Sequence, residues 1–262
     1  DNLKICEHYG MEVISPASGS LACGDTGAGK MPEPEVLLQY ILKEVQYEKD
    51  LKGKKILVTA GPTREAIDPV RYITNHSTGK MGYAIAKRAM LRGADVTLVS
   101  GPVALDPVPF VKMVPVTTAQ DMFEAVSGGF PEQDILIKAA AVADYRPSNV
   151  SDEKVKKRDG DMAIALERTT DILGYVGEHK KPEQIICGFS METQNMLENS
   201  RKKLKKKHLD MIVANNLKEQ GAGFGTDTNR VTIISEKEEK NLELMSKEEV
   251  ADEILNYILE FK

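Results

Sequence analysis

A polar, turn-rich connection of unusual length joins the apolar run Lys55–Ala60 to a helix that is predicted to begin near Gly79. Strand-to-helix connections in α/β units usually contain about 2 to 6 residues, so residues 61–79 are expected to have a function of their own. A helix N-terminus binds anions because its first backbone N–H groups are free and the helix dipole is positive there. The residues at this terminus are Ser77, Thr78 and Gly79. The sequence therefore predicts a phosphate site at the carboxyl end of a first strand.

Three further side chains in or beside this connection suit a phosphate ligand. Lys80 and an arginine of the connection, Arg64 or Arg71, supply positive charge, and Asn75 supplies an amide. The spacing fits neither a dinucleotide-binding turn, which needs G-x-G-x-x-G, nor a Walker loop, which needs an earlier glycine five residues before Gly79. A long surface loop with a helix cap explains the same residues without a ligand, and this alternative stays open.

A second candidate site follows the apolar run 134–140. The segment Lys138–Asp144 passes through small residues, which let a base or a backbone approach closely, to a carboxylate that could hold ribose hydroxyls, an amino group or a metal. An aspartate turn at the end of a strand explains Asp144 equally well. Lys154 and Lys156 share one face if their segment is extended, and their place beyond the same strand end favours phosphate contact.

The run Arg201–His208 is strongly basic and, taken alone, is typical of a nucleic-acid patch. It forms the tail of a predicted helix, residues 195–207, where cations stabilise the negative end of the dipole. Lys203 and Lys207 are four residues apart, so they share a helix face and could bind a triphosphate together. Because the chain has a net charge of -5, a polyphosphate ligand or plain solvation is favoured over DNA.

None of these motifs pairs a nucleophile with a base. The histidines lack triad partners and H-E-x-x-H spacing; they are His8, His76, His179 and His208. We therefore expect nucleotide chemistry in which cations and amides stabilise developing charge, without covalent catalysis by the protein.

Alternating strands and helices must position these motifs. The apolar runs that predict buried strands are 55–60, 95–100, 111–116, 134–140, 184–189 and 210–214. A helix is predicted at 80–92 with Gly93 as its stop, and Thr118 and Asp121 have the spacing of a capping box. The expected fold class is α/β, with a mostly parallel sheet covered on both faces. Ligands of such sheets bind at the carboxyl ends of the strands, where the candidate motifs lie.

The first 50 residues differ from the rest of the 262-residue chain. A Gly- and Ser-rich segment at 15–30 precedes a short helix near 33–48 and a charged, linker-like segment at 48–55. We therefore expect one domain or linker region at 1–50 and a second domain at 51–262. The chain starts Asp-Asn-Leu without a Met, so we also expect a fragment of a longer protein.

The composition argues against a membrane-spanning protein and against a general nucleic-acid-binding protein. No apolar run approaches the roughly 18 residues needed to cross a bilayer, and the acidic balance does not indicate general nucleic-acid affinity. The cysteines show no metal-ligand spacing and favour a reducing, cytoplasmic environment. They are Cys6, Cys23 and Cys187.

The motifs together resemble bacterial phosphopantothenate-cysteine ligase, the synthetase half of the bifunctional coenzyme A biosynthesis protein. The resemblance covers residues 53–260. The segments that carry it are Val58–Gly82, Ala139–Arg146, Lys154–Lys157, Asp171–Leu173, Gly188-Phe189 and Ala214–Asn216. Residues 1–40 resemble the C-terminal end of the fused flavin-dependent phosphopantothenoylcysteine decarboxylase, where Cys23 matches the proposed proton donor of an active-site flap. FMN is implied only for that decarboxylase, most of which this chain lacks.

The resemblance implies a Rossmann-like three-layer sandwich and a homodimer in which an extended excursion near Lys154 helps to close the partner's pocket. It also implies a reaction. The carboxylate of 4'-phosphopantothenate attacks the α-phosphate of CTP, pyrophosphate leaves, and the amine of L-cysteine then displaces CMP from the acyl-cytidylate. Magnesium is expected with the nucleotide, although no ligand set is evident in the sequence.

Site residues follow from the resemblance by position. Asn75 matches the family's catalytic asparagine, which acts on the acyl-cytidylate, and Lys154 matches a lysine that supports its formation. Ala140 matches a residue beside the cytidine. The other matches to nucleotide-binding positions are Asp144, Thr169, Thr170, Asp171, Ile172, Phe189, Lys203 and Lys207, while Ser77, Thr78 and Gly79 are expected at phosphate. The segment Arg168–Asp171 departs from the pattern Lys-Asn-Pro-Asp, so the roles of Thr169 and Thr170 stay open.

Two hypotheses from other classes also stay open. An NAD(P)-binding oxidoreductase on a similar sheet would bind NADPH in place of CTP. A polyanion-binding module that uses residues 201–207 would show salt-sensitive binding to any polyanion and no CTP turnover.

Overall fold

The computed structural model describes residues 2–20, 25–156, 162–192, 195–216 and 223–261. The chain forms two compact units, Asp1–Tyr47 and Glu48–Lys262, and each is described by itself.

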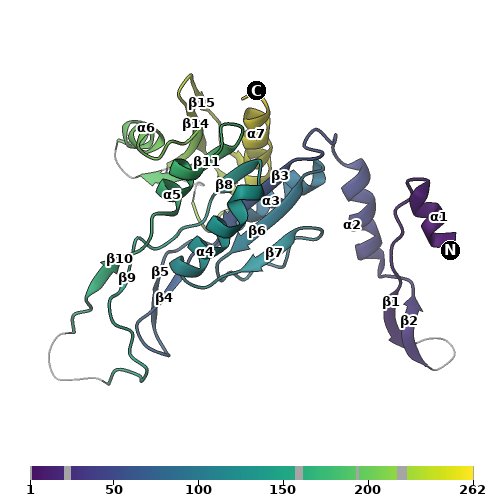
Figure 1. Ribbon diagram of the computed structural model, residues 1–262, viewed down its shortest axis with the longest axis horizontal. Helices are drawn as coiled ribbons and strands as arrows, with labels where there is room; N and C mark the ends of the chain where they lie inside the picture. The colour runs from purple at the N-terminus through teal and green to yellow at the C-terminus, as the bar shows by residue number, and fades with distance from the viewer. Residues whose placement is uncertain (1, 21–24, 157–161, 193–194, 217–222, 262) are drawn as a thin grey trace. The chain divides into compact units, whose positions relative to one another are not determined.

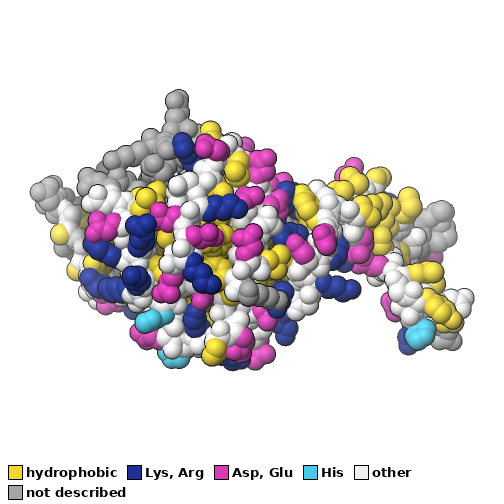
Figure 2. Space-filling model, turned by 90° about the horizontal axis from the view of Figure 1, so that it is seen from above, with side chains coloured by type: hydrophobic (Ala, Val, Ile, Leu, Met, Phe, Trp, Pro, Cys, Tyr) yellow, Lys and Arg dark blue, Asp and Glu magenta, His cyan; other side chains and the backbone are white. Residues whose placement is uncertain are grey.

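The smaller unit contains two helices and a hairpin. Helix α1 (Asn2–His8) precedes an antiparallel hairpin of β1 (Ala17–Ser20) and β2 (Thr26–Lys30), and α2 (Pro34–Val45) follows as predicted near 33–48. Neither helix has a buried residue. Hydrophobic side chains are therefore gathered on the surface of this unit (Figure 2), and it has no core of its own in the described residues.

An eight-stranded sheet forms the centre of the larger unit, with the order β15-β14-β12-β11-β8-β3-β6-β7 (Figure 1). The six strands from β12 to β7 are parallel, as predicted. They are β3 (Lys55–Ala60), β6 (Asp95–Ser100), β7 (Lys112–Pro115), β8 (Ile135–Lys138), β11 (Ile185–Glu192) and β12 (Met211–Asn216). Two antiparallel strands that the sequence analysis did not predict, β14 (Val231–Ser235) and β15 (Glu239–Asn241), extend one edge.

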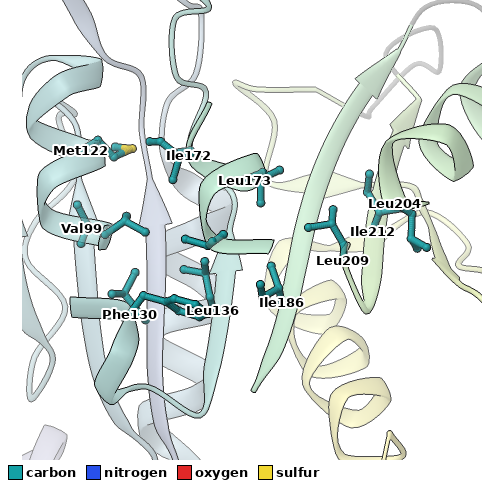
Figure 3. Close-up of a cluster of buried hydrophobic side chains, with 14 of the residues drawn as sticks. Val99, Met122, Phe130, Leu136, Ile172, Leu173, Ile186, Leu204, Leu209 and Ile212 are labelled. Carbon is teal, nitrogen blue, oxygen red and sulfur yellow. The ribbon is translucent and has the colours of Figure 1, made fainter. Parts of the chain in front are cut away.

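Helices cover both faces of this sheet. On one face, α4 (Ala119–Gly129), the 3₁₀ turn η1 (Phe130–Glu132), α5 (Ile172–His179) and α6 (Met196–Lys206) pack on alternate strand residues (Figure 3). Leu57, Leu136 and Ile186 belong to this cluster. The residues between them in the strands, such as Ile56 and Val58, are also fully buried. They lie on the face where α3 (Lys80–Leu91) packs on β3 and β6 and α7 (Lys247–Leu259) packs on α3, so the layers are α/β/α.

The helix ends follow the local signals of the sequence. Thr118 and Asp121 form the predicted capping box, with the Asp121 N–H donating to Thr118 Oγ1 at 3.1 Å and the Thr118 N–H donating to Asp121 Oδ2 at 2.8 Å. Gly93 has a φ of +91° two residues after α3 ends. No helix among the described residues is long and apolar enough to cross a membrane.

The connection 61–79 is more ordered than the sequence indicated, because it contains a hairpin of β4 (Arg64–Ala66) and β5 (Tyr72–Thr74). Thr63, Glu65 and Asp68 are buried, so the simple surface-loop alternative is wrong for this part. A second hairpin, β9 (Tyr145–Pro147) with β10 (Leu166–Arg168), contacts β4. The two hairpins project together from the sheet (Figure 1). Two-residue strands β13 (Thr228–Asn229) and β16 (Met245–Ser246) pair near the start of α7.

The strand order contains a topological switch point. The chain passes from β3 to β6 and β7 on one side, and then crosses back to β8 on the other side of β3. Connections from β3 and β8 therefore leave the sheet next to each other, which opens a crevice at their carboxyl ends. The fold brings the first and second candidate motifs to this crevice.

Candidate active site

Hydrogen bonds join the connections after β3 and β8 along the crevice. The Ala141 N–H donates to the Gly61 carbonyl at 2.9 Å, and the Ala143 N–H donates to Thr63 Oγ1 at 3.0 Å. Asn75 Nδ2 donates to the Ala141 carbonyl at 2.9 Å. The predicted catalytic amide is therefore held by the backbone of the second motif.

A cavity of about 470 Å³ opens beside this junction. The predicted residues among its lining are Asn75, Ser77, Thr78, Gly79, Ala140, Asp144, Phe189 and Lys203. Gly79 is the N-cap of α3 and has a φ of +81°, a conformation that favours glycine. A Cβ on Gly82 would lie 2.6 Å from the Cβ of Ala60 and 2.9 Å from the Thr59 carbonyl oxygen, so glycine lets α3 pack directly on the end of β3. The helix N-terminus thereby faces the larger cavity.

Residues 223–227 lie against the N-terminus of α3. Thr78 Oγ1 donates to the Phe224 carbonyl at 2.5 Å, and Lys80 Nζ contacts Asp227 Oδ1 at 2.7 Å. Lys247 Nζ, from the start of α7, donates to the Gly223 carbonyl at 2.9 Å. Burial, followed by the charge of Lys80, lowers the pKa of Lys247 to about 8, while Asp227 acts against the shift. Two lysines thus line the same end of the larger cavity, where Asp227 offsets part of their positive charge.

A second cavity, of about 380 Å³, adjoins the first. The predicted residues among its lining are Asp144, Thr169, Thr170, Asp171, Ile172, Lys203 and Lys207. Asp171 is the N-cap of α5, where its carboxylate accepts from the Gly174 N–H at 3.0 Å, and it also forms an ion pair with Lys207.

The two threonines of the smaller cavity differ in their contacts. Thr169 Oγ1 donates to the Ala143 carbonyl at 2.6 Å, and its N–H donates to the Asp144 carbonyl at 3.0 Å. Thr170 is exposed at the cavity surface. The structure therefore gives Thr169 a part in holding the cavity wall and leaves the Thr170 side chain at the surface where a ligand would lie.

The two cavities share a wall formed by Lys138, Val142, Asp144 and Lys203. Lys203 Nζ donates to the Phe189 carbonyl at 2.9 Å, which fixes its ammonium there. Burial, followed by the charge of Lys203, lowers the pKa of Lys138 to about 8, and Asp144 opposes this shift. A ligand that spans both cavities must pass two ammonium groups and one carboxylate.

Two predicted site residues lie elsewhere. An arginine of the connection was expected at the phosphate site, but the Arg64 guanidinium lies 4.7 Å from the centre of the Tyr72 ring, and neither Arg64 nor Arg71 is in the lining of either cavity. The hairpin turns the Arg64 side chain towards β5. Lys154 is exposed and also outside both linings. Cys23 lies outside the described residues.

A buried ion pair fastens the segment that carries Lys154. The Asp68 side chain is fully buried; its Oδ2 accepts from Arg71 Nε at 3.1 Å and from the Val155 N–H at 3.1 Å. Arg71 also donates to the Val155 carbonyl at 3.2 Å. The hydrogen bonds from Arg71, with those from the Val70 and Val155 N–H groups, hold the pKa of Asp68 well below its usual range. Lys154 therefore stands beside a rigid anchor outside this chain's own cavities.

Sequence reasoning assigned no role to several polar residues of the site, among them Lys138, Lys247 and Asn215. Asn215 is only 5% exposed, lines the larger cavity, and its Oδ1 has no hydrogen-bond partner among the described residues. The available signal was its place directly after the buried run of β12, at the strand end where ligands of parallel sheets bind.

Three cations of the basic run at 201–207 form ion pairs with carboxylates of the same chain. Arg201 pairs with Glu239, Lys202 Nζ lies 2.7 Å from Glu198 Oε1, and Lys207 pairs with Asp171. On the face shown in Figure 2, basic and acidic side chains are interspersed. This arrangement does not suit a general polyanion-binding surface.

Comparison with known proteins identifies the family. The model described as "DNA/pantothenate metabolism flavoprotein C-terminal domain" matches residues 51–261. The chain belongs to this family. A bifunctional coenzyme A biosynthesis protein, CoaBC, from Bacillus subtilis (strain 168) is 50% identical over 98% of this chain and 64% of its own length. The chain therefore spans less than two thirds of that relative.

A second relative and a solved structure are also similar to this chain. A cysteine/cysteine sulfinic acid decarboxylase from an unidentified prokaryote is 46% identical over 98% of this chain and 74% of its own length. The crystal structure of the C-terminal domain of a CoaBC protein is 49% identical, covers 79% of this chain and 95% of its own, and superposes with a TM-score of 0.68. The expected family and the Rossmann-like fold are confirmed, and both cavities lie within the family domain.

Proposed function

We propose that this chain joins L-cysteine to 4'-phosphopantothenate with the cleavage of CTP to CMP and pyrophosphate, as a step of coenzyme A biosynthesis. The observation that carries the proposal is the pair of adjoining cavities with a shared wall of Lys138, Asp144 and Lys203. A ligation through a nucleotidyl intermediate needs two neighbouring pockets, because the acyl substrate must reach the phosphorus of the nucleotide. The names of the CoaBC relatives support coenzyme A biosynthesis.

The cavities suit different substrates. The smaller one, with Thr169, Ile172 and Lys207, would hold most of the nucleotide, which would reach across the shared wall to Ala140 and Phe189. The larger one would hold phosphopantothenate, with its phosphate at the α3 N-terminus near Lys80 and Lys247, because that end combines free N–H groups with cations.

The proposed reaction has two steps. A carboxylate oxygen of phosphopantothenate attacks the α-phosphorus of CTP, forming the mixed anhydride and releasing pyrophosphate. The free amine of cysteine then attacks the acyl carbon, the bond to the CMP oxygen breaks, and an amide forms. Asn75 would stabilise the oxyanion of this second step, because its amide is already held at the crevice by the Ala141 carbonyl.

Magnesium is part of the proposal as the ion that would neutralise the triphosphate. Among the described residues no group of three or more His, Cys, Asp or Glu side chains could hold a metal. Magnesium at nucleotide sites uses one or two carboxylates with phosphate oxygens and waters, so Asp144 on the shared wall suits it.

We further propose a cytoplasmic homodimer in which Lys154 serves the partner's cavities. Lys154 lies outside the cavities of its own chain, and the projecting hairpins expose apolar side chains. These are Val70, Tyr72, Tyr145, Val150 and Leu166. In this proposal residues 51–262 are the ligase domain, and residues 1–50 are the end of a decarboxylase domain plus a linker.

Pyrophosphate release tests the function. The protein is mixed with 4'-phosphopantothenate and each of CTP, ATP, GTP and UTP, with and without cysteine. We expect CTP to give a burst of pyrophosphate without cysteine, and steady turnover to the amide and CMP with it. Pantothenate without its phosphate should react poorly, because it lacks the group that the α3 N-terminus would bind. Absence of pyrophosphate with all four nucleotides would refute the proposal.

Two other activities are controls in the same preparation. The decarboxylase named among the relatives is checked by carbon dioxide release from cysteine sulfinic acid. Binding of NADPH is measured beside binding of CTP, which separates the oxidoreductase hypothesis from the ligase. We expect CTP binding and neither of the other two results.

A further inference from the structure

Lys138 is the last residue of the central strand β8, at the carboxyl edge of the sheet. It contributes to the lining of both cavities and so belongs to their shared wall. Its position is set by a rigid strand that pairs with β3 on one side and β11 on the other. The backbone of Lys138 is therefore firmly placed where the two cavities meet.

No carboxylate forms an ion pair with Lys138 in the described part of the chain. Its Nζ has one distant contact, to the Ala140 carbonyl oxygen at 3.5 Å. The ammonium of Lys203 repels it, and the carboxylate of Asp144 attracts it more weakly. A half-buried cation beside a second cation is unfavourable unless an anion binds between them. The shared wall is therefore built to accept negative charge.

The reaction places such a charge at the wall. When the acyl substrate fills the larger cavity and the nucleotide fills the smaller one, the attacked α-phosphorus must lie where the cavities meet. We propose that Lys138 binds the α-phosphate of the nucleotide and stabilises the charge that grows on its non-bridging oxygens during attack. This inference rests on the proposed ligase function. Lys138 donates hydrogen bonds from its ammonium and transfers no proton, while the bond from carboxylate oxygen to phosphorus forms and the bond to pyrophosphate breaks.

Three variants of the full chain test this role. Lys138→Met removes the charge, Lys138→Arg keeps it, and Lys55→Met removes a charge at the exposed amino end of the neighbouring strand β3. In single-turnover pyrophosphate release at pH 7, we expect Lys138→Met to be slower by about 100-fold or more, the loss typical of one transition-state donor. The rate of Lys138→Arg should stay within about tenfold of the rate of the unsubstituted protein, because the charge is kept. The rate of Lys55→Met should equal that of the unsubstituted protein. Equal rates in Lys138→Met and Lys138→Arg would overturn the proposal, whatever their stability.

The pH dependence gives a second readout. The rate should fall above about pH 8 as Lys138 loses its proton, and this fall should disappear in Lys138→Arg because a guanidinium stays charged. Lys247, whose pKa is also lowered to about 8, is the competing source of such a fall. The other charged or titratable groups that line the two cavities are His76, Lys80, Asp144, Tyr145, Arg168, Asp171, Lys203 and Lys207. A fall that persists in Lys138→Arg and disappears in Lys247→Arg would assign it to Lys247 and overturn the assignment to Lys138.

Direct binding separates this inference from the proposed function. In calorimetry with CTP alone, Lys138→Met should weaken binding about tenfold, as expected for one charge-assisted hydrogen bond, and Lys55→Met should leave it unchanged. If the unsubstituted protein binds CTP but releases no pyrophosphate, the proposed function fails while the binding comparison still tests Lys138. Unchanged CTP affinity in Lys138→Met, together with an unchanged rate of pyrophosphate release, would refute the inference alone.

Discussion

Backbone groups hold the side chains that would do chemistry in this protein. Asn75 donates to the Ala141 carbonyl, and Lys203 donates to the Phe189 carbonyl, both at 2.9 Å. A backbone carbonyl in a strand or in a bridge beside one is a fixed partner, so each side chain loses little further entropy when a ligand arrives. Pre-ordered donors of this kind stabilise developing charge most effectively.

Replacement of Asn75 by alanine should separate the two steps of the proposed reaction. Because Asn75 would act on the acyl-cytidylate, Asn75→Ala should still release a burst of pyrophosphate from CTP and phosphopantothenate. Amide formation with cysteine should be slower by about 100-fold or more, the usual cost of losing one oxyanion donor. Quenched-flow measurement of pyrophosphate and amide in the same samples checks both steps. Asn256→Ala, at an exposed position of α7, is the matched control, and a normal amide yield from Asn75→Ala would contradict the assignment.

At the scale of elements, one buried carboxylate links the hairpin β4–β5 to the segment that carries Lys154. Asp68 accepts from the backbone N–H groups of Val70 and Arg71, both at 2.9 Å, as well as from Val155 across the chain. Asp68 lies in the turn between β4 and β5, and Val155 lies between β9 and β10. Hydrogen bonds to one carboxylate, and not the pairing of strands, therefore hold these two segments together. The position of Lys154 therefore depends on the charge of Asp68.

Asp68→Asn should weaken this anchor and reduce the acid sensitivity of the fold. The pKa of Asp68 is lowered in the folded state, so its contribution to stability is complete above the ordinary carboxyl pKa of 3.8 and is lost as the pH falls below it. Urea unfolding at about pH 6 and about pH 3 should show a smaller loss of stability for Asp68→Asn than for the unsubstituted protein. Asp106→Asn, at an exposed position, should behave like the unsubstituted protein. Equal losses in Asp68→Asn and the unsubstituted protein would show that Asp68 is not the group responsible.

At the scale of the whole molecule, the chain divides into two units that differ in how much of their apolar surface is buried. The unit Glu48–Lys262 contains the layered core and both cavities. Its projecting hairpins expose Val70, Tyr145 and Leu166, which would provide apolar contacts in the proposed dimer. In the proposed dimer, this projection carries Lys154 from one subunit to the cavities of the other.

Mixing two inactive variants tests the shared pocket. Lys154→Gln should fail to release pyrophosphate, and Asn75→Ala should fail to form the amide. If Lys154 serves the partner, a mixed dimer has one site with both residues intact, so random exchange of subunits should restore about a quarter of the unsubstituted activity. Subunits are exchanged by mild denaturation and refolding, and each variant refolded alone is the control. No recovery in dimers shown to be mixed by mass spectrometry would place Lys154 and Asn75 in the same subunit's site.

Local patterns in the sequence determined the main elements of the fold. The apolar runs at 55–60 and 95–100 coincide with β3 and β6, and the capping box of α4 and the end of α3 follow short-range signals. Such patterns are local because burial of a strand or the capping of a helix depends on a few successive residues. The predicted nucleotide-binding residues other than Lys154 also line the cavities, most of them in connections that follow the strands or at helix ends.

The tertiary structure alone decided how these residues meet. The hairpin β4–β5 turned Arg64 away, the segment 223–227 reached the N-terminus of α3, and the shared wall joined Lys138 to Lys203. Lys138 and Lys203 are far apart in the chain, and only the parallel order of β8 and β11, with α6 packed on β11, brings them together. Their mutual repulsion and their common cavity wall are properties of distance in space, which residue types and spacing along the chain do not specify.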